Sequence, residues 1–117
     1  MILNFAGVPE QVANWPRRPA VAVPGASGCA RVRSCQAGNV HLRVIEYEPG
    51  YLADHWCSKG HILYVAAGEL AIEHEDGAPA HRLAAGMGWH LSDDQAPAHR
   101  VRSEQGATVF IIDSLPA

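Results

Sequence analysis

Apolar and polar residues alternate along much of this chain over short stretches, which predicts β-strands rather than helices. The segment from Val40 to Glu48 is rich in β-branched and apolar residues and ends at the turn signal Pro49-Gly50. Further strands are expected at His61 to Ala66, Leu70 to Glu75, Met87 to Leu91, around Val101 and at Thr108 to Ile112. Gly68 closes the first of these runs, and Asp76-Gly77 is a hairpin turn after the second.

Glycine and proline divide the chain into short pieces of fairly even length. The sequence has 11 glycines and 8 prolines in 117 residues, and only Val8 to Trp15 is compatible with a helical turn, which Pro16 would end. Several short strands without a crossover helix predict an all-β protein, an antiparallel sandwich or barrel, and a jelly roll suits this length. We expect one domain, with an extended segment at residues 1–25 that packs on the barrel or on a partner, followed by a barrel at residues 26–117.

Composition excludes several classes of function. The formal charge is −3, and the basic residues are scattered or occur in short groups such as Arg17-Arg18, which does not fit a nucleic-acid-binding surface. No window is long and apolar enough to span a bilayer, and the N-terminus lacks the features of a signal peptide, so we expect no membrane partner. The odd number of cysteines suits a reducing compartment, so we expect a cytoplasmic protein in which Cys29 and Cys35 are small buried residues.

The remaining cysteine lies in a stretch that is rich in metal-ligating side chains. On a strand, residues i and i+2 point to the same face, so His55 and Cys57 share a face and His61 has the same parity. His99 begins another predicted strand, and neighbouring strands of a barrel can bring all four side chains to one point. Imidazole nitrogen and thiolate sulfur are ligands that zinc and other borderline-soft metals prefer. The sequence therefore predicts a metal site at these four residues, and a metal-free barrel with a polar interior is the alternative.

These residues resemble the two motifs of the cupin superfamily, a group of small β-barrels. The first motif is a glycine, a His-x-His pair, a glutamate and a later glycine; here the corresponding residues are Gly50, His55-x-Cys57, His61 and Gly68. The second motif contains a glycine, a proline and a histidine before an asparagine; here they are Gly86, Pro97 and His99, with Ser103 at the asparagine position. The resemblance extends from Val40 to Asp113 and implies a cupin barrel with a metal ion inside.

A narrower resemblance concerns the small bacterial cupins that are named for an Asp-His-Cys-Trp (DHCW) motif. The chain is similar to them in the runs Asp54-His55-Trp56-Cys57, Lys59-Gly60-His61 and Gly68-Glu69-Leu70. Relative to the general cupin pattern, a cysteine replaces one histidine and a histidine replaces the glutamate. The total ligand charge stays the same while one donor becomes softer, so we expect a divalent ion, with zinc preferred, then iron or nickel, over manganese.

Four other residues are candidates for the surroundings of the metal. Asp54 either orients a histidine or forms a turn, and Trp89 is expected to line the interior. Arg43 and Tyr47 share a parity on the preceding strand, from which they reach either the pocket or solvent. The other histidines, His41, His74, His81 and His90, are expected to be solvated or hydrogen-bonded structure, with His74 and His81 facing water.

Two functions fit these features. In the first, a metal-binding cupin binds or converts a small organic molecule at a metal centre inside the barrel; the molecule and any catalytic residue are left unassigned. In the alternative, a non-enzymatic sensor or binding module has a closed, structural His3Cys metal site. The first needs an exchangeable ligand position, whereas the second needs a sealed site. In both cases we expect a homodimer that pairs through a sheet edge.

Overall fold

The computed structural model of this protein describes residues 5–115, which form one antiparallel barrel. A short 3-10 helix at Trp15–Arg17 (η1) precedes the strands. The strands are β1 (Val21–Pro24), β2 (Cys29–Ala37), β3 (Val40–Tyr47), β4 (Tyr51–Leu52), β5 (His61–His74), β6 (His81–Ala84), β7 (Gly88–Leu91), β8 (His99–Ser103) and β9 (Ala107–Ser114). No helix within residues 5–115 has both the length and the apolar character needed to cross a membrane.

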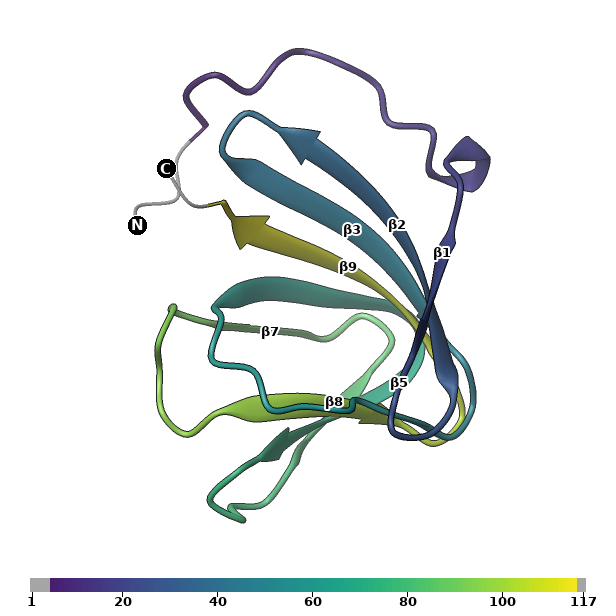
Figure 1. The fold of residues 1–117 in the computed structure, drawn as a ribbon, viewed down its shortest axis with the longest axis vertical. Helices are drawn as coiled ribbons and strands as arrows, with labels where there is room; N and C mark the ends of the chain where they lie inside the picture. The colour runs from purple at the N-terminus through teal and green to yellow at the C-terminus, as the bar shows by residue number, and fades with distance from the viewer. Residues whose placement is uncertain (1–4, 116–117) are drawn as a thin grey trace.

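The strands form two facing layers that share β5. The order along the sheet is β1-β2-β3-β9-β5-β8-β4, and β6 and β7 also pair with β5. Figure 1 shows β2, β3 and β9 side by side in one layer, which β7 joins through the first half of β5, and β8 in the other, with the layers converging at one end of the molecule. The predicted fold class, an all-β antiparallel barrel of the jelly-roll type in a single domain, is confirmed.

The long strand β5 produces the curl of the sheet. The sequence predicted two separate strands around Gly68, but the structure has one strand of 14 residues that pairs with β9 and β7 first and with β8 and β6 afterwards. A register shift between Val65 and Ala67 bends it at the crossing point. Gly68 follows with a φ of +76°, and a Cβ there would lie 2.1 Å from the carbonyl oxygen of Gly106. Only glycine fits both the backbone angle and this close approach.

Side chains at alternate positions of these strands fill the space between the layers. Because Leu63 and Val65 on β5 and Val109 and Ile111 on β9 have the inward parity, they are buried and pack together. The rest of the buried cluster is Ala30, Ile45, Tyr47, Tyr51, Leu70, Ile72, Leu83 and Ala107. The apolar core ends at the mouth of the barrel, where polar side chains take the inward positions.

The sheet begins closer to the N-terminus than the sequence predicted. Strand β1 lies inside residues 1–25 and pairs with β2, and neither strand was recognised. The reason is that β2 alternates arginines with small residues instead of with large apolar ones. Before β1, the chain lies against the outside of the sheet, with the ring of Trp15 6.1 Å from that of Phe110 and with Arg18 donating a hydrogen bond to the Ser34 carbonyl.

Candidate metal centre

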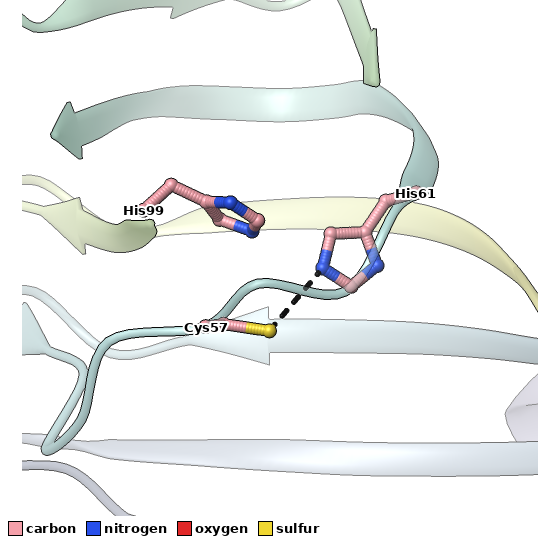
Figure 2. Close-up of side chains that lie close together, drawn as sticks. All are labelled: Cys57, His61 and His99. Atoms are coloured by element: carbon pink, nitrogen blue, oxygen red, sulfur yellow. Dashed lines mark hydrogen bonds between the residues drawn. The ribbon is translucent and has the colours of Figure 1, made fainter. Parts of the chain in front are cut away.

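Three of the predicted ligands come together at the polar end of the barrel. Cys57 lies in the loop between β4 and β5, His61 is the first residue of β5, and His99 is the first residue of β8. The ligand atoms of these three residues all lie within 4.8 Å of one another. Figure 2 shows the three side chains converging from different parts of the fold.

Cys57 is held in place by a pair of backbone hydrogen bonds. Its N–H donates to the carbonyl of His99 at 2.7 Å, and the N–H of His99 donates to the carbonyl of Cys57 at 2.9 Å. Residues that face each other in such an antiparallel bridge project their side chains to the same side. The bridge therefore places the thiol beside the His99 ring, and the backbone N–H of Lys59 donates to Sγ at 3.4 Å.

A buried carboxylate orients His61. The Nδ1 of His61 lies 2.5 Å from Oδ1 of Asp113, and the second carboxylate oxygen accepts a hydrogen bond of 2.6 Å from Arg43. Burial alone would raise the pKa of Asp113, but the His61 ring and the Arg43 guanidinium outweigh it and hold that pKa below its usual range. The ionised carboxylate therefore keeps the proton of His61 on Nδ1 and leaves Nε2, which lies 3.9 Å from the Cys57 sulfur, to bind a metal.

His99 is the most buried of the three. It is 2% exposed, and neither ring nitrogen has a hydrogen-bond partner among residues 5–115. Burial, together with the neighbouring rings of His61 and His74, lowers its pKa to about 4. His99 is therefore neutral at pH 7, which is the form that binds metals.

The donor set fits a divalent ion. In a tetrahedral zinc site, bond lengths of 2.0–2.3 Å place ligand atoms roughly 3.5 Å apart, so this group needs to contract by only about 1 Å. A metal ion would also bind a buried ring nitrogen of His99, which lowers the stability of the fold when it has no partner. The chemistry of one thiolate and two imidazoles suits a borderline-soft metal.

Comparisons with solved structures find the same architecture in cupins. A protein described as a predicted oxalate decarboxylase from Thermotoga maritima superposes with a TM-score of 0.74; it is 11% identical over 91% of this chain and 100% of its own length. An RmlC-like cupin from Shewanella frigidimarina gives a TM-score of 0.69, with 16% identity over 94% of this chain and 95% of its own. This chain has the cupin fold. No protein-family model and no curated protein matches it.

A third similar structure has a described activity. The sugar phosphate isomerase of the cupin superfamily from Silicibacter pomeroyi superposes with a TM-score of 0.65 and is 14% identical over 85% of this chain and 70% of its own. At these identities the likeness establishes the cupin barrel and leaves the chemistry to the side chains of this chain.

His55 is not part of the three-residue group. The stretch from Ala53 to Gly60 is a loop, so the alternation that would place His55 and Cys57 on one face does not apply. The His55 side chain is 75% exposed, and its Nδ1 lies 2.7 Å from Oδ1 of Asp54. This hydrogen bond lowers the pKa of Asp54. The role of His55 as a ligand stays a prediction from the sequence, and its side chain lies at the surface.

The other predicted residues lie at different distances from the group. The ring of Trp89 is 4.8 Å from that of His99 and 6.4 Å from that of His61, so Trp89 forms a wall of the site. Arg43 reaches the site only through Asp113. Tyr47 stacks on Tyr51 in the core and pairs with Ala107, six residues or roughly 20 Å along β9 from Asp113. Burial raises the pKa of Tyr47.

Asp113 is the functional residue that the sequence analysis missed. It continues the inward row of Val109 and Ile111, so its parity on β9 was available as a signal. An acid in an inward position at the end of an apolar row requires a buried partner. Its partners, Arg43 and His61, come from other strands, so only the fold identifies them.

Two hollows adjoin the group and give it access from outside. A cavity of about 580 Å³ reaches His61, and one of about 330 Å³ reaches His99. Gln95, in the loop between β7 and β8, lines both. The loop lies against Gly60, where a Cβ would be 2.6 Å from the backbone of Ser92 and Asp93.

Proposed function

We propose that this cupin holds a divalent metal ion at Cys57, His61 and His99 and binds or converts a small organic molecule at that ion. The convergence of these three donors carries the proposal. Three protein ligands leave a position for an exchangeable one, which is the arrangement of catalytic rather than structural zinc sites. The thiolate favours zinc, with iron and nickel as the next choices.

When bound, the ion would act as a Lewis acid or activate water or dioxygen. The residues of the chain have separate tasks around it. Asp113 orients His61, and the Lys59 amide stabilises the Cys57 sulfur. Trp89 packs against the ring of His99 and forms part of the wall of the site.

The alternative function, a closed structural site in a sensor or binding module, requires His55 as the fourth ligand. In that arrangement the site offers no position for a substrate, and loss of His55 lowers metal affinity as much as loss of Cys57. The exposed position of His55 and its bond to Asp54 favour the open site. The two functions therefore differ in the behaviour of one variant.

The test is the metal content of the purified protein, measured by elemental mass spectrometry on wild type, Cys57→Ser and His55→Ala. We expect near-stoichiometric zinc in wild type and in His55→Ala, and a large loss in Cys57→Ser. Equal losses in both variants would favour the closed site. A wild type that neither carries nor takes up a divalent metal would refute the proposal.

We also propose that the protein is a cytoplasmic homodimer. The three cysteines are free, which fits a reducing compartment. Strand β1 is the last strand of its sheet, and Val21 and Val23 on it are 63% and 43% exposed. An unpaired edge with apolar side chains supports pairing with a second copy.

A further inference from the structure

The smaller of the two cavities lies where β5 ends and β6 and β8 begin. Its volume is about 330 Å³, within the range of pockets that hold small molecules. Its lining includes His74, His81, Trp89, Leu91, Pro97 and His99. Because His99 also belongs to the metal group, a molecule in this cavity lies next to the metal centre.

Two histidines on the cavity wall, His74 and His81, contact each other, and their side chains have no hydrogen-bond partner among residues 5–115. The rings of His74 and His81 are 4.8 Å apart and nearly perpendicular, at 88°. Both were expected to face water; His81 is exposed, whereas His74 is half-buried, with an Nδ1 that has no solvent contact and no partner among residues 5–115. Because Nδ1 is closed to solvent, a ligand in the cavity would meet the other ring nitrogen of His74, Nε2, which carries the N–H in one neutral tautomer.

His99, on the same wall, has two ring nitrogens that are closed to solvent. Both of its ring nitrogens lack a partner among the described residues, and a metal ion satisfies only one of them. Each neutral imidazole carries one N–H that donates to an acceptor. The rings of His74 and His81 therefore present N–H groups to the cavity that no residue among 5–115 accepts, while both nitrogens of His99 are closed to solvent and His99 is left to the metal.

The net charge around the cavity indicates which ligands with hydrogen-bond acceptors fit it. No Lys, Arg, Asp or Glu of the described residues lines the cavity. At the adjoining metal site, a divalent ion with one thiolate keeps a net positive charge, because Arg43 balances Asp113. A singly negative ligand is therefore complementary. Trp89, Leu91, Ala96 and Pro97 provide an apolar surface for its body.

From these features we infer that the cavity binds a small monocarboxylate, with the carboxylate at His74 and His81 and the apolar body against Trp89 and Pro97. The inference rests on the proposed function, since the metal site supplies the positive charge. It names the substrate class of that site: a carboxylic acid with a short apolar body and a group that reaches the ion.

The test is isothermal titration of zinc-loaded protein with benzoate and with propionate, and with benzyl alcohol as an uncharged control. The variants are His74→Ala and His81→Ala. Glu75→Ala is the matched control, because Glu75 is exposed, adjoins His74 in sequence and does not line the cavity. Zinc content and thermal unfolding of every variant are measured first, so that loss of binding is separated from loss of metal or of fold.

We expect benzoate or propionate to bind wild type and Glu75→Ala equally, and benzyl alcohol to bind at least tenfold more weakly. His74→Ala and His81→Ala should each weaken carboxylate binding about tenfold or more with zinc content unchanged. Zinc-loaded wild type that binds neither acid, or histidine variants that bind as wild type does, would overturn this inference alone. Equal affinity for benzyl alcohol would overturn the monocarboxylate class. A wild type that takes up no metal overturns the proposed function, and the charge argument with it.

Discussion

Replacing Asp113 by asparagine removes the charge that orients His61 and leaves the shape of the side chain unchanged. The carboxylate is 3% exposed and accepts hydrogen bonds from His61 at 2.5 Å and from Arg43 at 2.6 Å. An asparagine has one acceptor oxygen, so its NH2 group faces one of the two donors. If His61 is the one displaced, its proton moves to Nε2, the nitrogen that is needed for the metal.

The expected loss of metal affinity follows from this loss of orientation. Removing the partner of a metal-ligating histidine lowers metal affinity about 10- to 100-fold, which corresponds to about 1.4–2.8 kcal/mol. Because Arg43 also loses its charged partner, the free energy of unfolding of the metal-free protein should fall by about 2 kcal/mol. The assay is zinc titration against a competing chromophoric chelator at neutral pH, with urea unfolding of the metal-free protein measured separately.

Glu73→Gln is the matched control for this experiment. The Glu73 carboxylate also accepts hydrogen bonds from two donors, Arg100 at 2.8 Å and Arg102 at 2.9 Å, but it is 25% exposed and lies outside the metal group. We expect Glu73→Gln to lower stability by less and to leave zinc affinity unchanged. If Asp113→Asn binds zinc within twofold of wild type, the orienting role of Asp113 is wrong.

Three further predictions concern the barrel and its assembly. Gly68→Ala should lower the free energy of unfolding by more than about 2 kcal/mol, because its Cβ would meet the Gly106 carbonyl at 2.1 Å. Gly77→Ala, with a φ of +80° and nothing within 4 Å of the new Cβ, should lower it by about 1 kcal/mol. Equal losses of the two variants in urea unfolding would contradict this prediction. Burial lowers the pKa of His99 from 6.5 to about 4, so the unfolded chain takes up the proton first as pH falls. The metal-free protein should keep its full stability above pH 6.5 and lose up to about 3 kcal/mol between pH 6.5 and about 4, a slope that His99→Gln should flatten. Val21→Lys at the edge of β1 should convert the expected dimer to a monomer in sedimentation, and a monomeric wild type would contradict the assembly.

Local pattern was enough for the fold class because strand alternation is a short-range property. The runs predicted as strands at His61 to Ala66 and at Thr108 to Ile112 both form strands. Alternation did not predict the strand at Cys29–Ala37, because its residues do not alternate simply between apolar and polar. The N-terminal segment covers the outer face of this strand, so residues on that face are partly buried as well. Alternation also failed to join the two halves of β5, because glycine normally ends a strand and here accommodates a bulge.

What the sequence determined by itself is therefore the all-β class, the approximate strands and a short list of metal-ligating side chains. The tertiary structure decided which of these meet. Cys57 joins His61 and His99 because a backbone bridge to a residue far along the chain orients it, while His55 projects from the same loop into solvent. Asp113 acquires its role through a partner 52 residues away. Strand periodicity fixes the face on which a side chain lies, but in loops and at strand ends the direction of a side chain depends on long-range contacts that no local pattern encodes.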